Sequence, residues 1–263
     1  MMQEIFIVDA FAERPYTGNP AAVCLLDQAR EDRWMQAVAA EMNLSETAFL
    51  VARDTGAWEL RWFTPKTEVD LCGHATLASA HVLWSEFGVG PETLRFHTRS
   101  GRLTAVRDNE RIGLDFPADP PTPVSTPDGL IEALNAEPES VYRGREVLLV
   151  VLTHAAELCA LEPDMGRLAR LDARGVIVTA ESDRSEYDFV SRFFAPRAGI
   201  PEDPVTGSAH CTLGLYWGER FGKSALQGFQ TSARGGTVAV RLKGERVELW
   251  GRAVTTLKCM LYA

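Results

Sequence analysis

Two short segments of this 263-residue chain put reactive side chains beside a glycine. Asp70–His74 reads DLCGH and ends in an imidazole, whereas Glu202–Ser208 reads EDPVTGS and supplies carboxylates and a hydroxyl. Imidazole and carboxylate groups are the usual acids and bases that move protons in enzymes. Each segment stands just before a predicted helix, and the first backbone N–H groups of a helix can bind an anion. The pair therefore suggests proton transfer on an anionic substrate.

The glycines of these segments, Gly73 and Gly207, allow a ligand to approach the backbone closely. Two such helix starts could hold one substrate carboxylate between two halves of the chain, because each carries a partial positive charge. The alternative is that the glycines serve tight turns, that His74 is a structural histidine and that Asp203 is a helix cap. Different ionisable groups at matching positions favour a site, but the sequence alone leaves the alternative open.

Glu46 is a third candidate. It stands between a predicted helix and an apolar strand, next to Leu44, Ala48 and Phe49. Partial burial raises the pKa of a carboxyl group, and a base for carbon acids works best when its pKa is close to the working pH. A capping or solvent-facing glutamate is the alternative interpretation.

Matching blocks in the two halves indicate a duplicated unit. The clearest pair is Arg61–Lys66 and Arg192–Arg197, separated by 131 residues (192 − 61). Further pairs, in the same order, are Gly73–Trp84 with Gly207–Trp217 and Phe96–Leu114 with Phe229–Leu249. Several matched blocks in one order predict two copies of the same supersecondary unit.

Both copies mix strand and helix patterns. Alternating or β-branched segments such as Trp58–Phe63 and Gly175–Thr179 predict strands, and 3.6-residue spacing predicts helices at Ala75–Phe87 and Ser208–Phe221. We therefore expect an α+β fold of two pseudo-symmetric domains, each a mixed sheet wrapped around a central helix.

The domain boundary is expected near the middle of the chain. Residues 117–127 contain five prolines, which disfavour helix and stiffen an extended linker. We expect an N-terminal domain of residues 1–116 and a C-terminal domain of residues 128–263. The final strand is free to cross back to the N-terminal domain.

Composition excludes several classes of function. The net charge is −9 and the pI about 5.2, so nucleic acid and anionic membranes are poor partners. The longest apolar run, Val147–Leu152, is too short to span a bilayer. The acidic N-terminal residues Glu4 and Asp9 do not resemble a signal peptide.

The five cysteines are widely spaced and none forms a C-x-x-C pair. An odd number of free thiols is typical of a reducing compartment, so we expect a cytoplasmic protein. No cysteine and histidine spacing matches a structural zinc site, and no metal is expected.

Four unusual stretches make the chain resemble the PhzF-like family of phenazine-biosynthesis isomerases. They are VDAFAERPYTGNPAAV (Val8–Val23), MNLSETAFL (Met42–Leu50), RWFTPKTEVDLCGHATLASAHVL (Arg61–Leu83) and RFFAPRAGIPEDPVTGSAHCTLGLYW (Arg192–Trp217). The resemblance covers nearly the whole chain. It implies the diaminopimelate-epimerase-like fold, with two similar domains and an active site in the cleft between them, and a homodimer.

The resemblance also implies roles for single residues. Glu46 matches the catalytic glutamate, which moves a proton between ring carbons of a dihydro-hydroxyanthranilate, and His74 and Asp203 match polar partners that position substrate and assist transfer. Gly73, Gly207 and Ser208 match groups that hold a small carboxylate-bearing substrate, and Asn19, in a Gly18-Asn19-Pro20 turn, is expected to line the cleft. No cofactor is expected, because a base and hydrogen-bond donors can carry an allylic proton shift.

Two other functions remain as alternatives. Racemases and epimerases of the same fold use two thiols as acid and base. Here Cys72 fills the first position, but Thr206 fills the second and Cys211 is expected further along the helix, so the two-thiol mechanism is disfavoured. A non-catalytic module that binds small molecules is the second alternative, since fold does not fix function.

Overall fold

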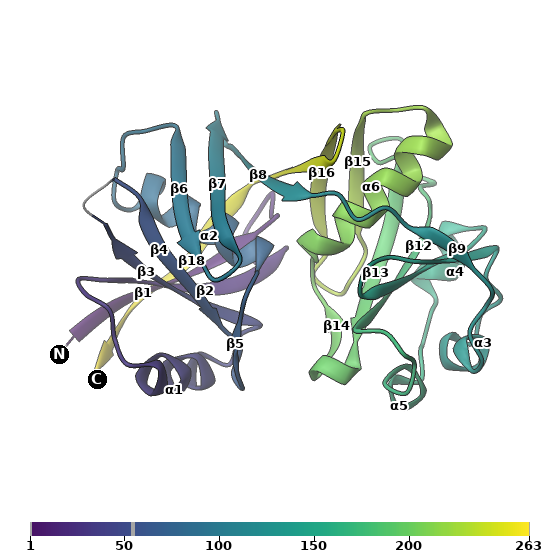
Figure 1. The fold of residues 1–263 in the computed structure, drawn as a ribbon, viewed down its shortest axis with the longest axis horizontal. Coiled ribbons are helices and arrows are strands. Elements are labelled where there is room, and N and C mark those ends of the chain that lie inside the picture. The colour runs from purple at the N-terminus through teal and green to yellow at the C-terminus, as the bar shows by residue number, and fades with distance from the viewer. Residues whose placement is uncertain (1, 54–55, 263) are drawn as a thin grey trace. The chain divides into compact units, whose positions relative to one another are not determined.

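The computed structural model describes residues 2–53 and 56–262, and the chain divides into two compact units (Figure 1). Unit 1 comprises Met1–Asp115 together with Trp250–Ala263, and unit 2 comprises Phe116–Leu249. Each unit combines a mixed sheet with helices, so the predicted α+β class is confirmed. Within the described residues, no helix is long and apolar enough to cross a membrane.

Unit 1 contains two helices and a mixed sheet of nine strands within the described residues. The helices are α1 (Asp32–Met42) and α2 (Gly73–Ser85). The strands are β1 (Met2–Ala10), β2 (Asn19–Leu26), β3 (Glu46–Ala52), β4 (Trp58–Phe63), β5 (Glu68–Val69), β6 (Thr93–Thr98), β7 (Gly101–Asp108), most of β8 (Arg111–Pro117) and β18 (Ala253–Tyr262).

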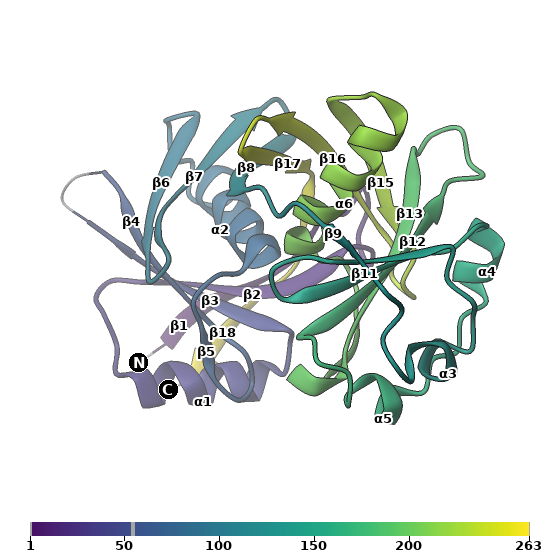
Figure 2. The same cartoon turned by 45° about the vertical axis from the view of Figure 1, so that its right-hand side comes forward.

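The strands of unit 1 pair in a mixed order. β1 lies antiparallel between β18 and β2, β2 is parallel to β3, and β3 is antiparallel to β4. β4 pairs antiparallel with β5 and parallel with β6, which continues antiparallel into β7 and β8. Met2 pairs with Tyr262, which puts the two chain ends side by side in Figures 1 and 2.

Helix α2 is the core of unit 1. The strands curve around it (Figure 2), and its side chains from His74 to Trp84 are buried except for His81. A helix that is apolar on all sides is stable only when it is enclosed in this way. The amphipathic α1 instead covers the sheet with Met35, Val38 and Ala39.

Unit 2 is built in the same manner. Its strands are β9 (Thr122–Val124), β10 (Ser140–Arg143), β11 (Val147–Val151), β12 (Gly175–Glu181), β13 (Phe189–Ala195), β14 (Ile200–Asp203), β15 (Ala225–Gln230), β16 (Gly236–Lys243) and most of β17 (Arg246–Gly251). Its helices are α3 (Leu130–Leu134), α4 (Ala155–Cys159), α5 (Met165–Leu168), the 3₁₀ turn η1 (Pro196–Ala198) and α6 (Gly207–Phe221).

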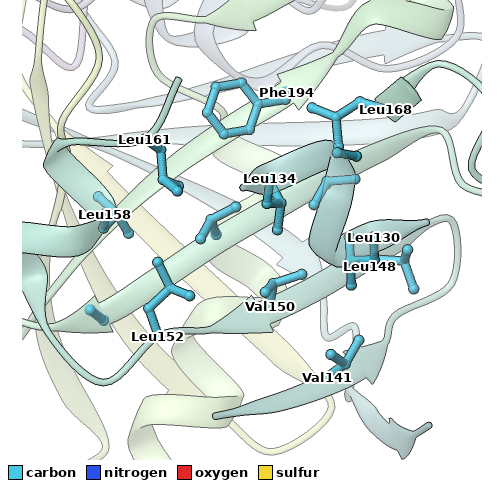
Figure 3. Close-up of a cluster of buried hydrophobic side chains, with 14 of the residues drawn as sticks. Leu130, Leu134, Val141, Leu148, Val150, Leu152, Leu158, Leu161, Leu168 and Phe194 are labelled. Carbon is cyan, nitrogen blue, oxygen red and sulfur yellow. The ribbon is translucent and has the colours of Figure 1, made fainter. Parts of the chain in front are cut away.

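The apolar run noted in the sequence forms β11, every residue of which is buried. It lies between β10 and the parallel β12, as strands covered on both faces do. On one face, Leu148, Val150 and Leu152 pack against leucines of the short helices (Figure 3), which are Leu130, Leu134 and Leu158. Helix α6 packs closely on β16, because Gly214 leaves room for Val240.

The pairings of unit 1 recur in unit 2. β10 to β13 pair as β1 to β4 do, β13 is antiparallel to β14 and parallel to β15, and α6 follows β14 as α2 follows β5. The expected linker at residues 117–127 contains β9, which pairs antiparallel with β10, just as β18 pairs with β1. Residues 122–124 of this segment are therefore part of the sheet of unit 2.

The repeat also preserves one ion pair. Arg61 on β4 donates two hydrogen bonds to Glu68 on β5, at 2.7 and 2.6 Å. Arg192 on β13 does the same to Glu202 on β14, at 2.8 and 2.9 Å. A two-pronged arginine–carboxylate contact fixes orientation as well as distance. It therefore anchors the short strand that leads into the central helix of each unit.

Candidate active site

The first group of candidate residues meets inside unit 1. Glu46 is the first residue of β3, and His74 lies in the first turn of α2. Oε2 of Glu46 lies 3.1 Å from Nε2 of His74, and their side chains are only 12% and 7% exposed. The contact has the distance of an ion pair without the alignment of a full hydrogen bond, which is common at catalytic pairs before substrate binds.

Two further side chains contact the other ring nitrogen of His74. Nδ2 of Asn19 lies 3.3 Å from Nδ1, and Sγ of Cys72 lies 3.6 Å from the same atom. Both side chains are buried. Because the ring is held at Nδ1, its Nε2 is directed at the carboxylate of Glu46. Asn19, which was expected to line a cleft, lies beside the ring of this histidine.

A glycine determines where Asn19 lies. The sequence suggested a turn at Gly18-Asn19-Pro20, but Asn19 already belongs to β2, opposite Ala10 of β1. Gly18 has a φ of +68°, and a Cβ on it would lie 2.2 Å from the carbonyl oxygen of Ala10. Only glycine can take this conformation against the neighbouring strand. The proline is tolerated because it stands at the beginning of the strand.

Burial and the charge of Glu46 act in opposite directions on the pKa of His74 and in the same direction on that of Cys72. Burial by itself lowers the pKa of His74, but Cys72 and Glu46 outweigh it, so this pKa lies well above its ordinary value. Burial, with the Glu46 charge as a second cause, raises the pKa of the Cys72 thiol. The Glu46 carboxyl group, which faces Nε2, thus favours the protonated form of the ring.

The same three side chains offer possible metal ligands, which spacing in the sequence did not reveal. The ligand atoms of Glu46, Cys72 and His74 lie within 4.8 Å of one another. The sulfur faces Nδ1 and the carboxylate faces Nε2. Because one ion binds one nitrogen of an imidazole, this arrangement suits hydrogen bonding at both ring nitrogens better than a shared ion.

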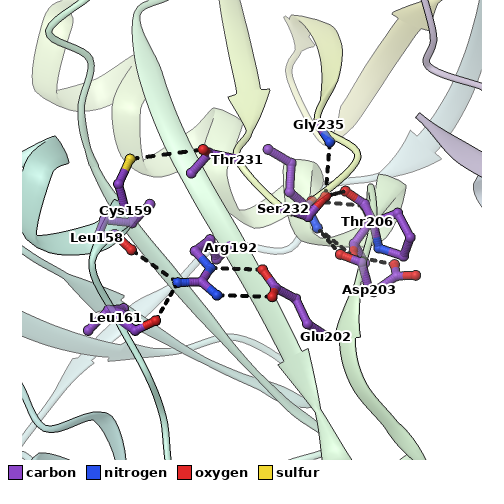
Figure 4. Close-up of polar contacts among 12 residues, drawn as sticks. Leu158, Cys159, Leu161, Arg192, Glu202, Asp203, Thr206, Thr231, Ser232 and Gly235 are labelled. Atoms are coloured by element: carbon purple, nitrogen blue, oxygen red, sulfur yellow. Dashed lines mark hydrogen bonds and ion pairs between the residues drawn. The ribbon is translucent and has the colours of Figure 1, made fainter. Parts of the chain in front are cut away.

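The second group of candidates lies in unit 2. Asp203 is the last residue of β14, and Thr206 directly precedes α6. Both are buried, and the Thr206 hydroxyl donates a hydrogen bond to Oδ2 of Asp203 at 2.5 Å (Figure 4). The adjacent Arg192–Glu202 pair fixes the strand that carries Asp203. The residue at the N-cap position of α6 is Thr206, three positions after Asp203.

Gln230 is a buried residue of this site that the sequence did not single out. Its Oε1 accepts from the backbone N–H of Thr206 at 2.9 Å, and its Nε2 donates to the carbonyl of Asp203 at 2.7 Å. Ser232 donates to the carbonyl of Pro204 at 2.7 Å. Together they hold the turn from Asp203 to Thr206. The repeated Phe229–Leu249 block contains both residues, but a repeat alone does not separate turn-holding residues from sheet residues.

Both predicted glycines begin their helices. Gly73 is the first residue of α2 and Gly207 the first of α6, and Ser208 is an exposed residue in the otherwise buried first turn of α6. Neither helix has an acidic residue in its first turn or a hydrogen bond from the capping side chain. The partial positive charge at each helix start is thus not neutralised from within its own helix.

Only unit 1 carries the acid–base pair. Thr47 pairs with Phe63, and Val176 pairs with Phe194, which is the matching residue of the repeat. The position of Glu46 therefore corresponds to Gly175, which has no side chain. His74, the residue after Gly73, corresponds to Ser208, the residue after Gly207. The duplicated scaffold has thus become chemically asymmetric.

Comparison with known proteins finds relatives that span nearly the whole chain. Residues 8–259 match the family model described as phenazine biosynthesis-like protein. A Halalkalibacterium halodurans protein described as an isomerase is 49% identical over 99% of both chains. A Pseudomonas aeruginosa protein, also described as an isomerase, is 52% identical over 97% of this chain and 96% of its own.

Solved structures show the same fold. A PhzF-family protein of Enterococcus faecalis is 43% identical over the whole of both chains, with a TM-score of 0.96. A hydroxyproline epimerase of Agrobacterium vitis, 11% identical over 99% of this chain and 92% of its own, has a TM-score of 0.63 and so shares the fold alone. The expected epimerase-like fold of two similar units is confirmed. The chain belongs to the phenazine biosynthesis-like, or PhzF, family and is an isomerase of that family.

Proposed function

We propose that this isomerase works without a cofactor and shifts a proton on a small carboxylate-bearing substrate of the dihydro-hydroxyanthranilate type. The observation that carries the proposal is the contact of Glu46 with His74, a largely buried carboxylate and imidazole 3.1 Å apart. Proton transfer by a positioned carboxylate is effective when water is excluded and its partner is fixed in place. The held ring of His74 meets the second condition.

In this mechanism Glu46 takes a proton from one carbon of the substrate and returns it to another. The electron pair left by the broken C–H bond spreads over the allylic system, and the double bond moves when the second C–H bond forms. The raised pKa of His74 keeps its ring protonated near neutral pH. The imidazolium then stabilises negative charge that develops on the substrate. No atom is gained or lost, as an isomerisation requires.

The remaining candidates are proposed to hold the substrate. The uncapped helix start at Gly73 supplies backbone N–H groups for its carboxylate. In unit 2 the helix start at Gly207, with the Ser208 hydroxyl, offers groups of the same kind. Asp203, fixed by Thr206, accepts from a polar substrate group. Asn19 contributes through His74 rather than by contact with the substrate.

The two-thiol racemase mechanism has less support. Cys72 is a buried thiol with a raised pKa. The matching position is Thr206, whose hydroxyl is already engaged with Asp203. Cys211 lies in the second turn of α6 and is buried.

Assembly and location are also proposals. Family resemblance supports a homodimer, and the free cysteines support a cytoplasmic protein. Sedimentation at micromolar concentration tests the first of these, and a monomer would contradict it.

Solvent deuterium exchange tests the proposed chemistry. Wild-type protein is incubated in D₂O with dihydro-hydroxyanthranilate-type substrates, and incorporation at carbon is followed by NMR. Glu46→Gln should reduce incorporation by about 10³-fold or more while leaving the fold intact. Glu41→Gln, on the exposed side of α1, is the matched control. A Glu46→Gln protein as active as wild type would show that Glu46 is not the catalytic base. Unchanged turnover in both His74→Gln and Asp203→Asn would contradict the proposed active site.

A further inference from the structure

Unit 2 carries a second feature that the candidate active site does not use. Four arginines, Arg143, Arg145, Arg174 and Arg197, line one pocket of about 440 Å³. They come from β10, from the turn before β11, from the residue before β12 and from η1. Since the whole chain has a net charge of −9, this concentration of positive charge is local.

The acidic residues of the pocket neutralise only part of this charge. Glu146 pairs with Arg174 at 2.9 Å. Asp172 is fully exposed, and its carboxylate lies 3.9 Å from Arg197. Among residues 2–53 and 56–262, no carboxylate lies within ion-pair distance of Arg143 or Arg145. The pocket thus keeps an excess of guanidinium groups over carboxylates.

The backbone under the arginines is cross-linked by hydrogen bonds. Nη1 of Arg143 donates to the carbonyl of Asp172 at 2.9 Å, which ties β10 to the loop before β12. The backbone N–H of Arg174 donates to the carbonyl of Glu146 at 2.8 Å. Three of the chain segments around the pocket are therefore fixed relative to one another before any ligand arrives.

Asp119 fixes the turn that carries Arg145. One carboxylate oxygen accepts from the backbone N–H of Arg145 at 2.9 Å, and the other accepts from the Thr212 hydroxyl on α6 at 2.8 Å. A Cβ on Gly144 would lie 2.7 Å from the same carboxylate. The glycine thus permits this close contact, and the turn is held on a rigid helix. A site on rigid elements loses little entropy when it binds.

We propose that this arginine pocket binds a small organic phosphate with at least two negative charges. Guanidinium forks match phosphate oxygens in pairs, and arginine is the side chain best suited to this recognition. The pocket volume falls within the range of small-molecule sites and exceeds that of a single phosphate. Its apolar lining is confined to the small side chains of Ala173 and Ala198, so recognition is carried by charge. The proposal does not depend on the proposed isomerisation, because all of its residues lie outside that chemistry.

Titration calorimetry with pyrophosphate and with inorganic phosphate tests the proposal. Wild-type protein should bind pyrophosphate saturably and inorganic phosphate more weakly, since one phosphate engages fewer forks. Arg145→Glu should weaken pyrophosphate binding about tenfold or more, because it removes charge-assisted hydrogen bonds. Arg145→Lys, which keeps the charge but loses the fork, should give an intermediate loss.

Arg102→Glu is the matched control, because Arg102 is an exposed arginine on β7 of unit 1 and the change in net charge is the same. It should leave pyrophosphate binding within about twofold of wild type. An equal loss of pyrophosphate affinity in Arg102→Glu and Arg145→Glu would show that only the net charge of the protein matters, and this would overturn the proposal. Absence of saturable binding to the folded wild type would also overturn it, as would an affinity that rises steadily with the length of a polyphosphate. Thermal melts of every variant confirm that the protein tested is folded.

Discussion

The amide nitrogen of Asn19 lies 3.3 Å from Nδ1 of His74, although 55 positions separate the two residues in the chain. The contact occurs on the ring edge opposite Glu46. A histidine whose two nitrogens face different partners has a fixed ring orientation. The short segment GNP at the start of β2 thereby takes part in the proposed acid–base chemistry.

Asn19→Ala should lower kcat about tenfold with little change in KM, because it frees the ring of His74 without removing a group that binds substrate. The pH profile of kcat should shift as well, since Nδ1 loses its amide partner. Stopped-flow or coupled assays across pH 5–9 measure both effects. A loss expressed only in KM, with an unchanged pH profile, would instead assign Asn19 to direct substrate binding.

Cys72→Ala should retain turnover within about fivefold of wild type, since the buried Cys72 side chain is one of two contacts on Nδ1. In a two-thiol racemase the same change would remove an acid–base group and cost about 10³-fold or more. The assay is again solvent deuterium exchange. A loss of that larger size in a folded Cys72→Ala protein would restore the racemase alternative.

Gln230→Leu should lower the free energy of unfolding by about 2–4 kcal/mol. The leucine leaves the buried N–H of Thr206 and the carbonyl of Asp203 without their partner, and each orphaned group is costly. Urea unfolding measures the difference. Gln227→Leu, on the same strand and half-buried, serves as the control and should change stability by less than about 1 kcal/mol. Equal effects in the two variants would show that Gln230 has no special role in the turn.

Gly18→Ala should destabilise the protein by about 3–5 kcal/mol, because a positive φ and a backbone clash act together. Gly88 has a φ of +63°, but no atom lies close to the position of an added Cβ. Gly88→Ala therefore isolates the effect of the positive φ and should lower the free energy of unfolding by about 1–2 kcal/mol. Thermal melts compare the two variants. A similar loss of stability in Gly18→Ala and Gly88→Ala would mean that β1 can move away from the added methyl group.

The buried imidazole of His210 makes the free energy of unfolding depend on pH. It is fully buried in α6, its Nδ1 donates to the carbonyl of Thr206, and burial lowers its pKa to about 4. Between pH 6.5 and about 4 the unfolded chain therefore binds a proton that the folded protein does not. The stability contributed by neutral His210 is complete above pH 6.5 and declines by about 3 kcal/mol as the pH falls to about 4.

His210→Gln removes this titration, so unfolding experiments should give a flatter dependence on pH between 4 and 6.5 than in wild type. The difference between the two slopes, rather than either slope alone, reports on His210, because other groups titrate in the same range. If the free energies of unfolding of wild type and His210→Gln changed with pH in parallel, the pKa of His210 would be the same in the folded and unfolded states.

Local sequence determined most of the secondary structure. Alternation predicted β4 over the same residues, Trp58–Phe63, and helical spacing placed both central helices within two residues of their observed starts. β2 was missed, because Gly18 and Pro20 resemble a turn and only the pairing with β1 makes the segment a strand. Such long-range pairing has no local signal.

The residue types of the candidate site, and their positions beside two helix starts, were determined by the sequence alone. The tertiary structure decided which of them meet. It brought Glu46, Asn19 and Cys72 onto one imidazole, and it placed Gln230 under the turn that holds Asp203. The physical reason is that these contacts depend on which strand ends share one edge of the sheet and on the burial that follows. Burial and neighbouring charge then set the pKa of His74, and neither exists in the chain before it folds.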